Sequence, residues 1–492
     1  MRIKAPATLC ALPLLLTLVG ASAQSSDALK LAAERAVTSN PEVTARFNAY
    51  RAAIDGVDVG RAAYRPRVDL TASIGHDNDR ITSRNPESQS LNRTGVGLNL
   101  TQVLWDGLGT RHEVSRLGHD KLTRYFEFLD ITEQTALEAA RAHYDVQRFR
   151  RLVQLAEDNY VQHKYASVQI QSRFKAGVGR GVDLEQANAR LALAESNLTT
   201  EIANLHDVTA RYQRIVGESP PKQMPVSAPL SAGVPTNADE VVAASIRQSP
   251  AVSASVEGVR AARSTSALRQ SAFQPRVEAR LRAGAGNNFD GVRDQKHDSS
   301  AEIVLNWNLY NGGADQARVR QQVSVINQAS DLRDKACRDV RQTSVIAYND
   351  TRKLTEQLVY LDRNTLAIEK ARDAYRQQFD IGQRSLLDLL NSENELYTAK
   401  RAFAIAEYDL GIAYARTQAA MNQLTVQLGI ARLDSAAAEG TGWAEAHEAP
   451  QRCTVLAVEA AGVAKTELDQ RAQRISASVP ALPAAPAPVK KP

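Results

Sequence analysis

The chain contains the segment FKAGVGRGVDL at residues 174–184 and a related segment, FDIGQRSLLDL, at residues 379–389. Phe, Gly, Asp and Leu recur in the two segments at a constant distance of 205 positions, as in Phe174 and Phe379. In each segment a glycine-containing turn separates a long helical pattern from a leucine-rich one. A repeat at this distance indicates that the chain arose by internal duplication.

Other motifs repeat in the same order along the two halves. The pairs are NPEV at 40–43 with SPAV at 249–252, PRV at 66–68 with PRV at 275–277, and LWDG at 104–107 with LYNG at 309–312. The distance falls from 209 to 205 positions between the second pair and the third. One segment of the second copy is therefore four residues shorter at this point.

The distribution of proline indicates the domain boundaries. Residues 220–235 hold five prolines, whereas residues 87–219 and 276–449 hold none. A stretch without proline permits very long helices, because proline removes a helical hydrogen bond. We divide the chain into a signal peptide at 1–23, a first repeat at 24–219, a linker at 220–236, a second repeat at 237–429, a C-terminal segment at 430–479, and an Ala/Pro-rich tail, expected to be disordered, at 480–492.

The N-terminus predicts export from the cytoplasm. A basic start precedes an apolar run at residues 9–19, and the sequence ASA at 21–23 fits the cleavage pattern of a secretory signal peptide. The alternative is an uncleaved membrane anchor, which would need about 20 apolar residues. We expect cleavage before Gln24.

Composition narrows the classes of function. The 492 residues include 60 Lys and Arg and 55 Asp and Glu, a balance that gives no argument for a nucleic-acid partner. The sequence has no P-loop, dinucleotide fingerprint or nucleophile elbow, and its three cysteines are too few for a zinc or disulfide scaffold. We therefore expect no enzyme activity, cofactor or metal. Cys337 and Cys453 could pair after export, or Cys337 could remain buried and unpaired.

Each repeat predicts an antiparallel helical hairpin. The helical pattern is continuous over residues 108–174 and 313–379, which corresponds to roughly 100 Å at 1.5 Å per residue. A heptad pattern begins at Leu184 and again at Leu389, beside a stripe of mostly small residues that lets helices approach closely.

Four short segments alternate between apolar and polar residues, which is typical of strands with one apolar face. We expect strands at residues 68–74, 96–101, 277–283 and 302–309, joined by polar loops at 76–93 and 287–300. A soluble hairpin packed on helices would show the same alternation. If the strands cross a membrane, several chains must share one barrel, because about eight strands form the smallest barrel and open edges cannot face lipid.

These ordered motifs resemble the TolC-type outer-membrane channel-tunnels of Gram-negative bacteria. The resemblance runs from about Asp27 to Gly429 and is carried by NPEV at 40–43, YRPRV at 64–68, the turn Trp105-Asp106-Gly107 with its counterpart Tyr310-Asn311-Gly312, and the tips that end in VDL at 182–184 and LDL at 387–389. It implies an α+β membrane protein. Three identical chains would share a 12-stranded outer-membrane β-barrel and a long periplasmic helical barrel, with the linker and the C-terminal segment at its waist.

The resemblance also implies a function and partners. The chain would be a passive exit channel, working with a periplasmic adaptor protein and an inner-membrane ABC transporter or proton-driven pump. It looks most like the branch that serves type I protein secretion, including export of agglutination adhesins, and the absence of a lipobox around Cys10 favours this branch. The alternatives are a drug-efflux channel and, more distantly, a coiled-coil structural or adhesive protein of the envelope.

The family closes its periplasmic end with the helical tips, and this implies gate residues by position. Asp183 of the first tip would face Arg384 of the second, within a chain or between neighbours. Phe379 occupies an aromatic gate position, and Asp388 would line the narrowest ring. Asn391 stands where a second acid is expected. The adaptor would dock on the turn residues Gly177, Val178, Gly179, Gly382, Gln383 and Ser385.

Helix capping offers a simpler role for two of these positions. Asp183 is placed to cap the helix that follows it, with Gln186 three residues on, and Ser385 could act in the same way with Asp388. Arg384 could equally be a solvated surface charge.

Overall fold

A computed structural model describes residues 21–289, 292–431, 433, 453 and 465–477. The chain divides into a first unit that ends at Thr454 and a second unit, Val455–Pro492. The helix α10 (Lys465–Ala477) is the described part of the second unit. Most of the expected signal peptide, most of the C-terminal segment and the whole tail at 480–492 lie outside the described residues.

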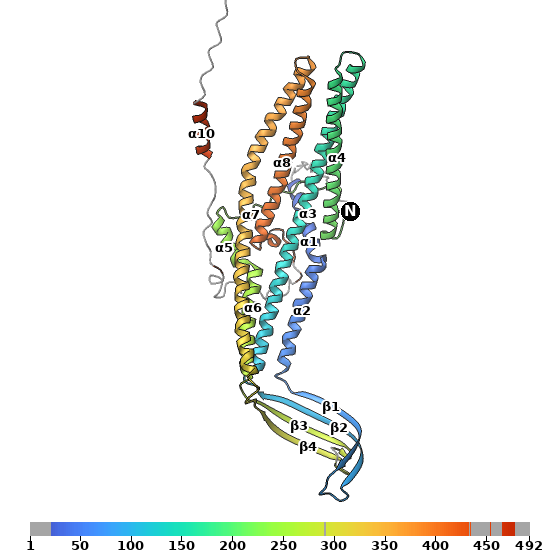
Figure 1. The fold of residues 1–492 in the computed structure, drawn as a ribbon, viewed down its shortest axis with the longest axis vertical. Helices are drawn as coiled ribbons and strands as arrows, with labels where there is room; N and C mark the ends of the chain where they lie inside the picture. The colour runs from blue at the N-terminus through green and yellow to red at the C-terminus, as the bar shows by residue number, and fades with distance from the viewer. Residues whose placement is uncertain (1–20, 290–291, 432, 434–452, 454–464, 478–492) are drawn as a thin grey trace, which may run out of the picture. The chain divides into compact units, whose positions relative to one another are not determined.

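The same order of elements occurs twice along the first unit (Figure 1). The first copy consists of α2 (Pro41–Ala62), β1 (Arg67–Arg80), β2 (Ser88–Trp105), α3 (Gly109–Lys175) and α4 (Gly181–Val216). The second consists of α6 (Pro250–Ser271), β3 (Arg276–Asn287), β4 (His297–Asn306), α7 (Ala314–Asp380) and α8 (Leu386–Ala420). The helices α1 (Ala21–Ser39) and α5 (Ala238–Gln248) precede the copies, and α9 (Leu424–Gln427) follows them. The expected duplication is confirmed.

The repeated Pro motifs start the helices α2 and α6. Asn40 caps α2 by accepting a hydrogen bond from the backbone N–H of Glu42, and Ser249 caps α6 by accepting one from Val252. Proline follows each cap, where its missing N–H costs nothing because the first turn of a helix has no intrahelical partner for it. The two motifs are therefore helix starts.

Small residues form the largest core cluster of the helices. Ala136, Ala139 and Ala140 of α3 pack there against Ala33 of α1 and Ile215 of α4. In α4 the stripe beside the heptad is buried, and it consists of Ala187, Ala194, Glu201, Val208 and Ile215. Close packing of alanines explains how this chain forms a core with few aromatic residues.

The linker between the repeats lies across three helices of the first unit. The Tyr144 hydroxyl of α3 donates to the carbonyl of Ala228 at 3.0 Å, and Gln418 of α8 donates to the carbonyl of Ala232 at 2.7 Å. The Tyr348 hydroxyl of α7 donates to the carbonyl of Thr236. These side chains hold the linker to the bundle about midway along the long helices.

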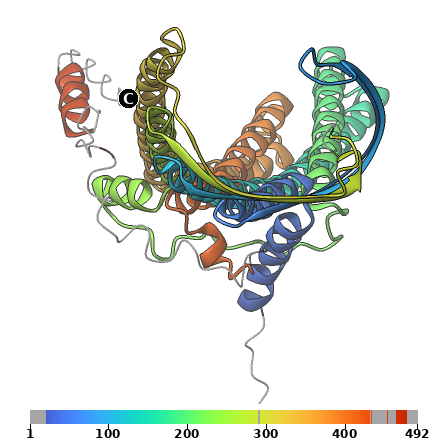
Figure 2. The same ribbon diagram turned by 90° about the horizontal axis from the view of Figure 1, so that it is seen from below.

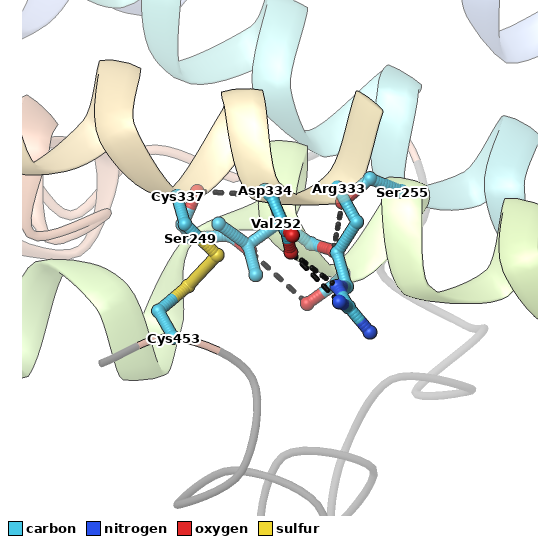
Figure 3. The surroundings of a disulfide bond; sticks show 8 residues. Ser249, Val252, Ser255, Arg333, Asp334, Cys337 and Cys453 are labelled. Carbon is cyan, nitrogen blue, oxygen red and sulfur yellow. Dashed lines mark hydrogen bonds and ion pairs between the residues drawn. A yellow bond between two sulfur atoms is a disulfide. The ribbon is translucent and has the colours of Figure 1, made fainter. Parts of the chain in front are cut away.

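A disulfide joins Cys337 of α7 to Cys453, with a Cα–Cα distance of 5.6 Å. Figure 3 shows the bond beside the start of α6, near Ser249 and Val252. Of the two states left open by the sequence, the structure therefore contains the paired one. The bond attaches a residue of the C-terminal segment to a long helix.

The four strands form one antiparallel sheet in the order β1-β2-β3-β4. The sheet lies at the end of the helices opposite the two tips (Figure 1), and Figure 2 shows it as a curved band. None of the described helices is both long and apolar enough to span a bilayer.

The strands differ from the expected ones at their ends. β1 and β2 extend through most of the expected loop at 76–93, since polar residues also pair across them, as His76 does with Asn92. β4 begins at His297, inside the second expected loop, and ends at Asn306, so Trp307 and Leu309 lie outside it. Backbone pairing does not depend on side-chain polarity, so the alternation of apolar residues could not locate these ends.

Candidate functional site

The two helical tips have the same backbone turn. Gly177 and Gly382 each adopt a left-handed conformation with φ of +77°, which favours glycine because it has no Cβ atom. The expected docking residues surround these glycines, and Val178 is 80% exposed. Ile381 of the second tip is exposed as well. Each tip thus presents an apolar side chain next to a fixed turn.

The helices that leave the tips start differently. The Ser385 hydroxyl accepts a hydrogen bond from the backbone N–H of Asp388 and donates one to its carboxylate, at 3.2 and 2.9 Å, so this expected cap is confirmed. The expected cap at Asp183 is wrong. α4 begins at Gly181, and Arg180 is its N-cap residue without a side-chain hydrogen bond. Asp183 lies within the first turn, where its charge interacts favourably with the helix dipole.

Arg384 contacts residues of its own hairpin. Its guanidinium donates to Gln378 at 3.0 Å, lies 3.7 Å from Asp388, and stacks over the Tyr375 ring at 4.6 Å from the centroid. Asp183 forms no ion pair with any described residue. An Asp183–Arg384 link between neighbouring chains therefore stays a prediction, while within this chain Arg384 has other partners.

Polar contacts join the two hairpins below the tips. Arg190 of α4 donates to Asn391 of α8 at 2.8 Å, and the Arg173 guanidinium lies 5.0 Å from the centre of the Phe379 ring. Two expected gate residues, Phe379 and Asn391, thus contact the other hairpin of the same chain. A neutral Asn391 suits this role because its amide oxygen accepts the hydrogen bond without adding a charge.

Further along, Glu201 of α4 is buried and forms an ion pair with Arg401 of α8 at 2.9 Å. This contact was not predicted from the sequence. The sequence feature that could have indicated it is Glu201 itself, an acidic residue within a stripe of mostly small residues. A buried carboxylate requires a partner on another element.

A further acid lies near the tips and was not predicted from the sequence either. Glu393 of α8 lies 3.4 Å from Arg372 of α7. Burial raises the pKa of the Glu393 carboxyl above its usual value, and the Arg372 guanidinium acts in the opposite direction. An acid is therefore present two residues beyond Asn391, although it faces its own hairpin.

The turns between strands and long helices also repeat. The carboxylate of Asp106 accepts hydrogen bonds from the backbone N–H and the hydroxyl of Thr110, at 2.7 and 2.5 Å. Asn311 occupies the corresponding place and donates to Asp315 at 2.6 Å. Gly107 and Gly312 have positive φ angles of 67° and 70°. The side chains and glycines of these motifs redirect the chain from the sheet into α3 and α7.

The sheet has one apolar and one polar face. The apolar face is solvent-exposed in the single chain and includes Val68, Leu70, Ile74, Val96, Leu98, Leu281, Ile303 and Leu305. The other face carries Asp69, Thr71, Asn99, Arg280, Arg282 and Glu302. The outer edges of β1 and β4 pair with no other described strand. A water-soluble protein rarely exposes such a surface, because free edges and large apolar patches promote association.

The model of the family described as outer membrane efflux protein matches residues 32–218 and 241–423, one span in each repeat. The chain belongs to the outer membrane efflux protein family. The resemblance to TolC-type proteins is thereby confirmed, and the family description is that of a transport protein rather than an enzyme.

Curated relatives cover most of this chain. Outer membrane efflux protein BepC of Brucella suis biovar 1 is 26% identical over 84% of this chain and 90% of its own length. Outer membrane protein TolC of Vibrio cholerae is 23% identical over 76% of this chain and 86% of its own length. Alkaline protease secretion protein AprF of Pseudomonas aeruginosa is 24% identical over 77% of this chain and 81% of its own length. These names include both efflux and secretion, so they do not distinguish the two branches of the family.

Solved structures share the fold. The outer-membrane channel OprN superposes with a TM-score of 0.72 at 19% identity, over 82% of this chain and 92% of that one. The CmeC outer membrane channel of Campylobacter jejuni has a TM-score of 0.74 at 13% identity, over 92% of this chain and 98% of that one. The α+β fold of two helical hairpins above a four-stranded sheet is thus that of known outer-membrane channels.

Proposed function

We propose that this chain is one protomer of a homotrimeric, passive exit channel in the outer membrane of a Gram-negative bacterium. The observation that carries the proposal is the open sheet, with its exposed apolar face and its unpaired edges at β1 and β4. In lipid every backbone N–H and C=O must be paired, so β1 of one protomer must pair with β4 of the next. Three sheets of four strands then close a barrel of 12.

The dimensions and faces of the strands suit this arrangement. A tilted strand needs about 9–11 residues to cross a bilayer, and the shortest of the four, β4, has 10. The apolar face would contact lipid, and the polar face would line a water-filled lumen. The long helices would continue the passage through the periplasm, and a cleaved signal peptide would deliver the chain to this compartment.

The tips are the proposed contact with the other components. A periplasmic adaptor would dock on the exposed turns around Gly177 and Gly382, and an inner-membrane transporter would supply the energy. The ring formed by three copies of Asp388, together with Arg384, would control the periplasmic opening. Arg384 lies against Asp388 at 3.7 Å, so a change in one of these side chains would also affect the other.

The finer role that we propose is type I protein secretion. The relative AprF is named for secretion of alkaline protease, which supports a protein cargo. The relative BepC is named an efflux protein, which supports small-molecule efflux as the second candidate. A deletion strain distinguishes the two roles. Loss of a protein from the culture medium with unchanged drug susceptibility supports secretion, and the opposite pattern supports efflux.

Fractionation and conductance test the channel itself. We expect the chain in the outer-membrane fraction, as a trimer that resists detergent until heated, and single-channel currents in planar bilayers. A monomer in the soluble periplasmic fraction, without currents, would overturn the proposal. It would favour a non-channel envelope protein.

A pair of neighbouring substitutions tests the faces of β3. Leu281→Arg places a charge on the apolar face and should cost about 2–4 kcal/mol near the middle of the bilayer. Arg280→Leu, one residue away on the polar face, should be tolerated because that position faces water. The yield of unheated trimer measures both, and equal loss for the two variants would contradict the assigned faces.

A further inference from the structure

A single aromatic side chain at the start of the turn between β3 and β4 folds back over the sheet. Phe289 lies beyond the end of β3, yet it is only 5% exposed. Its ring lies on Gly95 of β2 and Gly284 of β3, where an added Cβ atom would come within 2.3 and 2.4 Å of ring atoms. The ring therefore occupies the space that side chains at these two positions would fill.

The glycines under the ring lie on the polar face of the sheet. Gly95 and Gly97 alternate along β2 with Val96 and Leu98, which belong to the apolar face. In the register of the sheet Gly97 is paired with Gly284, and Gly95 is paired with Gly286. We call Gly95, Gly97 and Gly284 the glycine patch, because a Cβ atom added at each would lie within 4.0 Å of the Phe289 ring. Glycine weakens a strand, so three glycines at neighbouring positions indicate a place where another group approaches closely.

Several hydrogen bonds hold the turn in this position. Asn288 has a positive φ of 50°, its amide nitrogen donates to the carbonyl of Asn92 on β2 at 2.9 Å, and its amide oxygen accepts from the backbone N–H of Asp294 at 3.0 Å. The backbone N–H of Phe289 donates to the carbonyl of Gln295 at 3.2 Å. The Arg282 guanidinium, on the same face, lies 5.3 Å from the centre of the ring. The ring is thus held by the glycines of the sheet and by the guanidinium that lies over it.

We propose that Phe289 is a size-selecting residue of the channel. By occupying the glycine patch it holds the start of the β3–β4 turn over the polar face, which is the lumen face of the proposed barrel. This end of the sheet is the one distant from the helices (Figure 1), so three copies of Phe289, one from each protomer, would narrow the outer end of the passage. The inference rests on the trimeric channel proposed above and assigns it a constriction for bulky polar solutes.

Three variants test this assignment by releasing the ring. Phe289→Ala removes it, and Gly95→Ala and Gly284→Ala each place a methyl group where the ring lies. All three should raise single-channel conductance, by roughly 1.5- to 2-fold because one constriction in a long passage is widened. They should also sensitise cells to a large polar antibiotic such as a glycopeptide.

Two control variants match the tested ones. Gly75→Ala adds a methyl group on the same face of the sheet, where only the Arg93 side chain lies nearby, at 3.7 Å. Val292→Ala trims an exposed side chain in the same turn. Both controls should conduct like the parent protein.

The outcomes separate this inference from the proposed function. A parent protein without currents would refute the channel itself. A conducting parent whose Phe289→Ala and Gly284→Ala variants have unchanged conductance would refute the size-selecting role alone. Unheated trimer is measured for every variant. If all three lose the trimer while the controls keep it, Phe289 is a folding residue and the inference is overturned.

Discussion

The helices α3 and α7 are each 67 residues long and occupy the same place in their repeats, but their surroundings differ. α3 packs against α1, α2, α4, α6, α8 and α9, and 24 of its residues are buried. α7 packs against α5, α6 and α8, and only eight of its residues are buried. Figure 2 shows α7 at the margin of the bundle and α3 closer to its centre.

The difference shows how a duplicated chain can build an assembly. One copy of the long helix has become the core of the protomer. The other keeps large apolar side chains in solvent, among them Val323, Leu332, Ile346, Val359 and Leu366. In the proposed trimer we expect some of these residues to face a neighbouring protomer. α3 should therefore determine whether a protomer folds, and α7 whether protomers associate.

The largest effect is expected from a core residue of α3. Phe128 is fully buried, and its ring lies 5.3 Å from that of Phe47. Phe128→Ala should destabilise the protomer by about 3–5 kcal/mol, because it removes buried apolar surface and leaves a cavity. Thermal unfolding in detergent, followed by circular dichroism, measures the loss. Unfolding like that of the parent would contradict the central role of α3.

Acid should reveal a second difference between the helices. His143 of α3 and Tyr348 of α7 occupy corresponding positions, and both contact the linker, His143 through the Ser227 hydroxyl at 3.0 Å. Burial, assisted by the Arg150 charge, lowers the pKa of His143 from 6.5 to about 4. Between pH 6.5 and about 4, the unfolded chain therefore binds a proton at this histidine, whereas the folded chain does not.

The contribution of neutral His143 to the free energy of unfolding is fully present above pH 6.5 and is lost as the pH falls toward 4. The total loss is about 3 kcal/mol. His143→Gln should flatten the dependence of the urea midpoint on pH in this range. Tyr348→Phe is the matched control and should keep the slope of the parent, because a phenol gains no proton in acid. An unchanged slope in His143→Gln would show that His143 is not the group responsible.

A smaller effect is expected on the exposed side of α7. Leu332 is 57% exposed in the single chain. Leu332→Ala should leave the unfolding of the protomer nearly unchanged but weaken each contact between protomers by about 2 kcal/mol, because apolar area buried there is lost. The temperature at which the trimer dissociates in detergent is the measurement. A trimer as stable as the parent would place Leu332 outside the interface.

The smallest effect concerns the tip that follows α7. Arg384→Ser removes the contacts to Gln378 and Asp388, which are exposed, so trimer stability should hardly change. Conductance should rise if three copies of Arg384 bias the periplasmic opening toward closure. The charge swap of Asp183→Arg with Arg384→Asp should restore closure if the two residues meet between chains. A double variant that conducts as much as Arg384→Ser would exclude that contact.

Much of this fold could be predicted from local patterns. The long helices follow from proline-free helical stretches, and the turns follow from glycines such as Gly177, whose left-handed backbone is a local property. The helix starts at Asn40 and Ser249 follow from cap and proline chemistry. These features depend only on residues close in the chain.

The remainder depends on groups distant in the sequence. Arg190 and Asn391 meet because two hairpins pack side by side, and neither residue signals its partner. The ends of β1 and β2 depend on backbone pairing, which polar residues such as His76 do not prevent. Phe289 could have been suspected only from glycines that recur at every second position of neighbouring strands, and an aromatic residue in a polar loop gives no sign of where its ring will lie.

The bond between Cys337 and Cys453 closes a covalent ring with a sequence separation of 116 residues, which contains the second tip, α8 and α9. Thiols remain reduced in the bacterial cytosol and are oxidised in the periplasm. In the proposed exported channel the ring would therefore close only after the chain has crossed the inner membrane. The redox state of one pair of sulfur atoms would thus distinguish an exported molecule from one retained in the cell interior, whether or not the expected cleavage before Gln24 has occurred.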